Sequence, residues 1–277
     1  NKDSIVFAHV GGRYANLDFH DSKLEVAIEV HSCWGTFEWL LKEAFQKGYR
    51  IAIFANSDDH KGRPGVSYPG ASTFGSLGGL TAILASSLTR DKIWEALKRR
   101  QTYATTGSRM LLWVETDDGL LPGDVKQVQV APRFKVVVAG TAPIELVEFW
   151  NGTKKLKHWR PYSTDDLGSR IKIVWSGAQA KGRSRQLYWK GEIKIKYNQL
   201  IDYQPINYFN WEQQWQQLGN RLKWESVTTG GQAGVIITLA SKKKGSLEFK
   251  SNLKNISIPL AKIGKEPLTF LLPTGLE

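Results

Sequence analysis

Asp58 and His60 follow an apolar run over residues 50–55, and their types and spacing suit metal chemistry. Two residues apart at the end of a strand, a carboxylate and an imidazole point the same way. Oxygen and nitrogen donors together are the ligands that a catalytic zinc, manganese or iron ion takes. Such pairs also arise by chance, so the pair indicates a metal site only if the neighbouring elements supply further ligands.

Two further histidines stand at the ends of earlier apolar runs. His9 follows residues 4–8, and His31 follows residues 24–30. Each could be a lone polar residue that ends a strand. Three histidines in the same position favour a shared site, because active sites of parallel α/β folds gather at the carboxyl ends of strands. We expect His20 and His158, which lie in a polar and a basic stretch, to be solvated.

Helices are predicted between and after these strands. Apolar residues recur at helical spacing over 37–45 and stop before Gly48, and a second helix is predicted from its N-cap Thr89 to residue 100. Residues 72–86 are Gly-rich and apolar, which predicts a loop leading into a buried helix. Alternation of apolar strands with helices predicts a parallel sheet or barrel.

Composition excludes several classes of protein. The chain has 277 residues, 41% of them hydrophobic, which suffices for one large or two ordinary domains. A single cysteine, Cys33, excludes an intramolecular disulfide and a cysteine-based zinc site. No run approaches the ~20 apolar residues of a membrane span. The chain begins at Asn1, almost directly in an apolar strand, so we expect that an upstream portion is missing.

Charge and tryptophan content both change near residue 108. Residues 1–108 hold 13 Lys/Arg and 11 Asp/Glu, a net charge of +2. Residues 109–277 hold the other 25 Lys/Arg and 15 Asp/Glu, a net charge of +10, together with eight of the eleven tryptophans. We therefore predict two domains, 1–108 and 109–277.

The second part consists of short runs with turn residues between them, several of them alternating polar and apolar. The runs cover residues 111–115, 134–138, 144–150, 170–175, 187–190, 191–197 and 235–239. This pattern is typical of an antiparallel β-sandwich. Asn151-Gly152 directly follows one run and predicts a hairpin turn. Trp211, Trp215 and Leu218 could form one helical face or line a long loop.

Four strings in the first part carry a resemblance to a known family. They are Ala-His-Val-Gly-Gly-Arg at 8–13, Val-His-Ser-x-Trp-Gly-Thr-x-Glu at 30–38, Ser-Asp-Asp-His-x-Gly-Arg-Pro-Gly at 57–65 and Arg-Gln-Thr-Tyr-Ala-Thr-Thr-Gly at 100–107. These strings resemble motifs of PHP-superfamily (polymerase and histidinol phosphatase) metallohydrolases, in the branch that contains carbaryl hydrolase. The resemblance covers residues 1 to about 150.

The resemblance implies a fold and a set of metal ligands. The fold is of the α/β plus all-β class, with the C-terminal part of a distorted (β/α)7 PHP-type barrel followed by the antiparallel β-sandwich. The implied ligands of the divalent metal ions (Zn, Mn or Fe) are His9, His31, Asp58 and His60. Glu29 or Glu38 could share the role of His31.

One departure from the family limits the site. The family opens with a His-x-His motif on its first strand, and this sequence has none. Four candidate ligands suffice for one ion but not for a complete multinuclear site. We therefore expect the chain to be an incomplete part of the enzyme, with the missing N-terminal portion of the same protein as its partner.

The predicted function is that of a metal-dependent hydrolase, in which metal-activated water attacks a phosphoester, carbamate, ester or amide. Arg13 and Arg63 lie beside ligand candidates and suit the binding of a small-molecule or anionic substrate, although each could instead form a salt bridge within its loop. The alternative is a non-catalytic binding or structural protein whose β-sandwich recognises carbohydrate or another anionic polymer. No nucleic-acid motif is found, so no nucleic-acid partner is expected.

Overall fold

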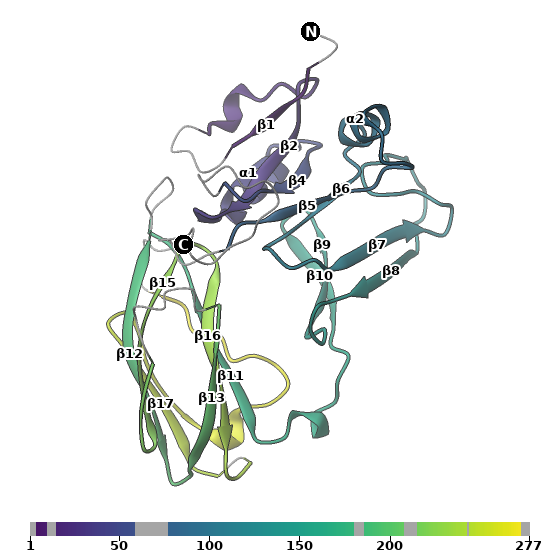
Figure 1. The fold of residues 1–277 in the computed structure, drawn as a ribbon. Coiled ribbons are helices and arrows are strands. Elements are labelled where there is room, and N and C mark those ends of the chain that lie inside the picture. The colour runs from purple at the N-terminus through teal and green to yellow at the C-terminus, as the bar shows by residue number, and fades with distance from the viewer. Residues whose placement is uncertain are drawn as a thin grey trace. The chain divides into compact units, whose positions relative to one another are not determined.

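The computed structural model describes residues 4–9, 15–58, 77–179, 186–207, 215–242 and 244–272. Strands dominate these residues, which form six separate sheets and two α-helices. The chain divides into two compact units, and their elements are labelled in Figure 1. The described residues up to Trp159 form the first unit, and those from Arg160 form the second. The change in composition near residue 108 lies inside the first unit.

A small parallel sheet organises the start of the first unit. Its strands β1 (Val6–Ala8) and β4 (Ala52–Ala55) both pair in parallel with the central strand β2 (Glu25–Ser32). A two-residue strand, β3 (Gly35–Thr36), turns back antiparallel onto the end of β2. The parallel pairing follows the prediction, and it brings the carboxyl ends of β1, β2 and β4 to one edge.

Side chains of β2 alternate between two cores, as the period of a strand requires. Ile28 joins a cluster with Phe37 and Leu40 at helix α1 (Glu38–Gln46). Ala27 faces the other way, into a cluster with Phe54 of β4. Helix α1 ends just before Gly48, whose φ of 73° is left-handed, as the predicted stop signal requires.

An antiparallel pair follows the parallel sheet. Strand β5 (Leu80–Ile83) pairs with β6 (Thr102–Thr105), and helix α2 (Arg90–Lys98) connects them. The Thr89 side chain accepts a hydrogen bond from Lys92 N at 3.4 Å, so the predicted N-cap is confirmed. The buried helix predicted near residues 72–86 is wrong where the chain is described, because residues 80–83 form a strand.

Two hairpins complete the first unit. Strand β7 (Leu111–Thr116) pairs with β8 (Phe134–Ala139), and β9 (Val147–Asn151) pairs with β10 (Lys154–Trp159), both antiparallel. Gly152, in the turn between β9 and β10, has a φ of 57°. The hairpin predicted from Asn151-Gly152 is therefore confirmed.

The second unit contains two antiparallel sheets. The three-stranded sheet has the order β11-β16-β13, and the five-stranded sheet has the order β14-β15-β12-β17-β18. The bounds are β11 (Arg170–Ser176), β12 (Leu187–Lys196), β13 (Leu200–Ile206), β14 (Gln216–Leu218), β15 (Arg221–Thr228), β16 (Gln232–Leu239), β17 (Ser246–Ser251) and β18 (Asn255–Pro259). Within the described ranges, 3-10 turns lie at Asp165–Leu167 and Leu260–Lys262 in this unit and at Leu17–Phe19 in the first unit.

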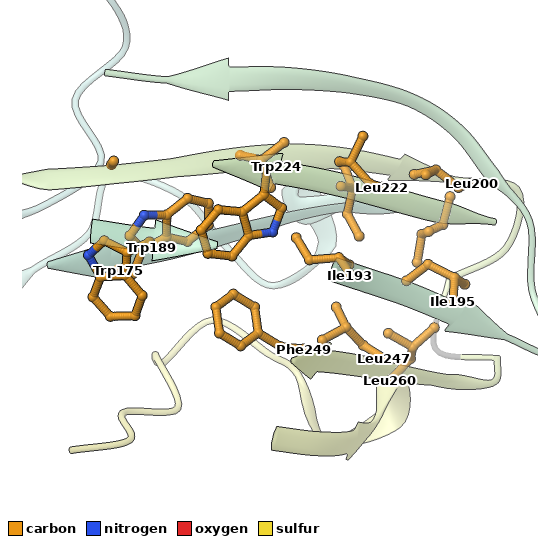
Figure 2. Close-up of a cluster of buried hydrophobic side chains, with 14 of the residues drawn as sticks. Trp175, Trp189, Ile193, Ile195, Leu200, Leu222, Trp224, Leu247, Phe249 and Leu260 are labelled. Carbon is orange, nitrogen blue, oxygen red and sulfur yellow. The ribbon is translucent and has the colours of Figure 1, made fainter. Parts of the chain in front are cut away.

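Tryptophan fills the core that the two sheets of the second unit share (Figure 2). The rings of Trp175 and Trp224 stack with centroids 4.0 Å apart. The indole N–H of Trp175 donates to Ser226 Oγ at 2.7 Å, and that of Trp189 donates to Thr228 Oγ1 at 2.8 Å. These three rings are structural, because all of them are buried and the indole nitrogens of Trp175 and Trp189 are hydrogen-bonded within the core.

The predicted fold class, a (β/α)7 barrel part followed by a β-sandwich over 109–277, is wrong. The parallel pairing does not continue after β4, because β5 and β6, which α2 connects, pair with each other antiparallel. Beyond residue 108 the predicted antiparallel pairing is present, but β7 to β10 form separate hairpins. Leu218 lies on strand β14 and not on a helical face, and Trp211 lies outside the described residues. None of the helices in the described ranges has the length and apolarity to cross a membrane.

Candidate functional site

Polar side chains gather where β1, β2 and β4 end. His9 directly follows β1, Glu29 lies on β2, and Asn56 and Asp58 follow β4. The register places Ala8 opposite Ile28 and Glu29 opposite Phe54. The parallel strands therefore deliver these four side chains to the same edge of the sheet.

A hydrogen-bonded series connects Asn56, Glu29 and His9. His9 Nδ1 lies 2.5 Å from Glu29 Oε2, and Asn56 Nδ2 donates to Glu29 Oε1 at 2.8 Å. Glu29 is buried, whereas the His9 side chain is 49% exposed. A carboxylate oxygen accepts, so Nδ1 of His9 carries a proton, and in the neutral imidazole Nε2 then keeps its lone pair.

The Asp58 carboxylate faces this free nitrogen. Its Oδ2 lies 3.8 Å from His9 Nε2, and the side chain is 21% exposed. The backbone of Asp58 has a φ of 45°, an uncommon value for a residue other than glycine. Cys33 holds this turn, because its Sγ donates to Asp58 O at 2.7 Å and its N donates to Ser57 O at 3.2 Å. Cys33 thus supports the backbone that aims Asp58 at His9.

His31 has a different set of partners. Its Nε2 donates to Leu77 O at 2.9 Å, so its Nδ1 accepts from the Thr36 hydroxyl, also at 2.9 Å. Burial lowers the pKa of His31 to about 4, although the Leu77 hydrogen bond raises it in part. A neutral His31 therefore ties β2 to the segment that precedes β5, with both ring nitrogens engaged.

Gly79 allows that segment to pass close to the site. A Cβ at this position would lie 2.4 Å from Ala55 Cβ and 2.9 Å from His31 Cδ2. The Gly79 N–H donates to Asn56 O at 2.7 Å. The missing side chain thus lets the backbone close over the end of β4 and hold Asn56 in place.

The structure places the other sequence candidates as follows. His60, Arg13 and Arg63 lie outside the described residues, so their predicted roles stay predictions. The expectation that His20 is solvated is wrong, because its side chain is 2% exposed, with its Nδ1 2.6 Å from Glu25 Oε2. His158 is exposed on β10. Asn56 was not predicted as a site residue from the sequence. Its position directly after a buried strand is the feature that could have identified it.

The donor set suits part of a metal site. His9 Nε2 and the Asp58 carboxylate supply one nitrogen and one oxygen ligand, a combination that zinc, manganese and iron accept. Within the described ranges, no group of three or more His, Cys, Asp or Glu side chains is arranged to hold an ion. Two ligands fill half of a tetrahedral shell, and His60 is the predicted third.

Comparison with known proteins gives partial matches. Residues 41–132 match the family model described as "Protein of unknown function (DUF3604)". An uncharacterized protein of Chlamydia muridarum is 32% identical over 101 residues, which are 32% of this chain and 16% of that protein. An uncharacterized protein of Chlamydia trachomatis serovar D is 33% identical over 113 residues, 36% of this chain and 18% of that protein. The matched region thus spans less than a fifth of either relative. No solved structure matches the chain.

These findings correct the resemblance drawn from the sequence. The assignment to PHP-superfamily metallohydrolases is wrong, because the matching family model is another one and the described residues do not form a (β/α)7 barrel. The geometry of His9, Glu29 and Asp58 stands independently of that resemblance.

Proposed function

We propose that His9 and Asp58 bind a divalent metal ion and that this site belongs to a metal-dependent hydrolase. The series Asn56–Glu29–His9 carries the proposal, because it leaves His9 Nε2 directed at the Asp58 carboxylate 3.8 Å away. Histidines that ligate metals characteristically donate their other ring N–H to a carboxylate, which fixes the ring and strengthens the ligand. Glu29 has that relation to His9.

Each residue of the site has a distinct role in this proposal. His9 and Asp58 hold the ion, Glu29 keeps the proton of His9 on Nδ1, and Asn56 keeps the buried Glu29 carboxylate in place. A bound ion supplies a Lewis acid and lowers the pKa of a water molecule toward neutrality. The substrate classes that fit this chemistry are phosphoesters, carbamates, esters and amides.

Residues outside the described ranges complete the proposal. His60 is the proposed third ligand, since it follows Asp58 by two residues. Arg13 and Arg63 are proposed to bind an anionic substrate or leaving group, because a guanidinium donates two parallel hydrogen bonds to a carboxylate or phosphate.

Metal-dependent hydrolysis by the full chain tests the function. Nitrophenyl phosphate, carbamate and acetate esters are offered with zinc, manganese or ferrous ion and with a chelator. The expected result is metal-stimulated turnover of one class that falls at least about tenfold in His9→Asn, with His158→Asn as the matched control. Turnover that resists the chelator, or that both variants reduce equally, contradicts the proposal. Metal binding without turnover of any ester supports the site alone and favours a non-catalytic role.

A further inference from the structure

The outer face of the five-stranded sheet in the second unit concentrates positive charge. Along β12, Trp189, Ile193 and Ile195 are buried, so the residues between them point outward. The same alternation holds on β15 and β17. The outward cations form what we call the lysine face: Lys190, Lys194, Lys196, Arg221, Lys223 and Lys250.

Half of these cations form no ion pair within the described residues, although the Glu248 carboxylate also attracts Lys194 and Lys250 through space. Three outward carboxylates share the face, and each forms an ion pair: Glu225 with Lys190 at 2.7 Å, Glu192 with Arg221 at 3.9 Å, and Glu248 with Lys196. Lys194, Lys223 and Lys250 form no ion pair with any described residue. Six cations against three carboxylates leave the face with a net charge of +3.

Two of the surplus lysines flank a shallow hollow. Glu192 pairs in register with Lys223 on one side and with Lys250 on the other, so these lysines stand two strands apart, about 9–10 Å. The hollow is open to solvent and is lined by Lys190, Gly191, Glu192, Lys223, Lys250 and Ser251. An extended anionic chain that runs across the strands would meet Lys250 and Lys223 in turn.

One exposed aromatic ring adjoins the hollow. Tyr188 is 60% exposed and precedes Lys190 on the same side of β12. The Asn252 side chain holds this end of the strand, donating to Tyr188 O at 3.0 Å and accepting from Lys190 N at 2.9 Å. The backbone beneath Tyr188 is therefore fixed, and its ring can stack on a planar or cyclic ligand group at low entropic cost.

We propose that the lysine face binds an acidic polysaccharide, with Lys194, Lys223 and Lys250 pairing with its anionic groups and Tyr188 stacking on a sugar ring. Proteins that bind single-stranded nucleic acid place successive bases on successive aromatic rings. The described strands of this face carry one exposed aromatic side chain, which suits a single sugar and not a run of bases. This binding is separate from the proposed hydrolase activity and does not depend on metal.

Affinity measurements on the full chain test the proposal. The ligands are polygalacturonate, which is carboxylated, heparin, which is sulfated, and neutral dextran; a single-stranded oligonucleotide serves as a competitor. The test variant is Lys194→Gln/Lys223→Gln/Lys250→Gln, which removes the surplus charge without touching the core. The matched control, Lys242→Gln/Lys244→Gln/Lys262→Gln, removes the same charge from exposed lysines outside the face.

The expected result is binding of one or both acidic polysaccharides, weakened about tenfold or more in the test variant and nearly unchanged in the control. The preferred ligand then distinguishes carboxylate from sulfate as the recognised group. Circular dichroism of both variants checks that the sheets are intact. Equal weakening by the two variants, equal binding of dextran, tighter binding of the oligonucleotide, or no binding of any polysaccharide would overturn the proposal.

Discussion

At the scale of single residues, the buried Glu29 carboxylate determines what His9 can do. It accepts from His9 Nδ1 and from Asn56 Nδ2, so the lone pair of the neutral imidazole is left on Nε2. The His9 side chain itself remains half-exposed. A carboxylate that is buried, and paired on both oxygens, is costly to lose because its partners would be left unsatisfied.

Replacing Glu29 by Gln tests this relation. The amide keeps one acceptor oxygen and carries no charge, so it can accept from His9 or from Asn56 but not from both, and the imidazole loses part of its fixed orientation and of its basicity. We expect the affinity for zinc or manganese to fall about 10–100-fold, the usual effect of removing such a partner. Isothermal titration calorimetry measures it, with Glu95→Gln on the exposed face of α2 as the control. Unchanged affinity in Glu29→Gln would show that Glu29 does not support a metal ligand.

Because His31 is buried in its neutral form, the stability of the folded chain should depend on pH. Burial lowers its pKa to about 4 from the 6.5 of an unperturbed histidine, so the folded chain holds it neutral where the unfolded chain would protonate it. Its contribution is complete above pH 6.5 and is lost as the pH falls toward 4. Over that window the free energy of unfolding should fall by about 3 kcal/mol on account of this residue.

The matching experiment compares urea unfolding at pH 7.5, 6 and 5 in the wild type, His31→Gln and His158→Gln. Glutamine keeps a donor for Leu77 O but cannot take up a proton, so His31→Gln should lose this part of the pH dependence. His158 is exposed, and its replacement should leave the dependence as it is. A wild type and a His31→Gln variant with the same slope would contradict a buried neutral His31.

At the scale of elements, the close approach of residues 77–79 to β4 shapes the site. Gly79→Ala would place a methyl group 2.4 Å from Ala55 Cβ, and neither backbone can yield easily. We expect a loss of about 1–3 kcal/mol in stability, the usual cost of overpacking. Thermal unfolding measures it against Gly264→Ala, where an added Cβ meets nothing within 4 Å. A tolerated Gly79→Ala would mean that this approach is looser than the structure shows.

The same elements show what the sequence could and could not predict. Local signals were sufficient for α1, which stops before Gly48, for α2, which begins after Thr89, and for the turn at Asn151-Gly152. They failed at residues 80–83, where an apolar, Gly-rich run suits a buried helix as well as a strand. Residues 80–83 form a strand because they pair with β6, about twenty residues later in the chain. A local sequence pattern contains no information about that pairing.

The site was predicted in part for the same reason. Strand ends located His9 and Asp58 at one edge, because parallel strands deliver their ends together. From the sequence, Glu29 is only one of two glutamates that could share the role of His31, whereas the structure makes it the partner of His9. The orientation of His31 depends on a hydrogen bond to Leu77, which is 46 residues away in the sequence. A local sequence pattern could not predict this contact.

At the scale of the whole molecule, two compact units carry two separate proposals. The first unit offers a histidine and a carboxylate for a metal ion, and the second offers a basic face above a tryptophan core. The uneven charge of the sequence, +2 before residue 109 and +10 after it, has a structural counterpart in the surplus lysines of that face. The metal site is the central claim, since the proposed hydrolysis depends on it.

Titration of the full chain with manganese, followed by nuclear magnetic resonance of the histidine rings, tests that claim most directly. A paramagnetic ion broadens the resonances of the rings nearest to it. The account predicts that sub-stoichiometric Mn²⁺ removes the His9 signals while those of the exposed His158 persist, and that Asp58→Asn abolishes this selectivity. Equal broadening of His9 and His158, or intact His9 signals at one equivalent of Mn²⁺, would contradict the account.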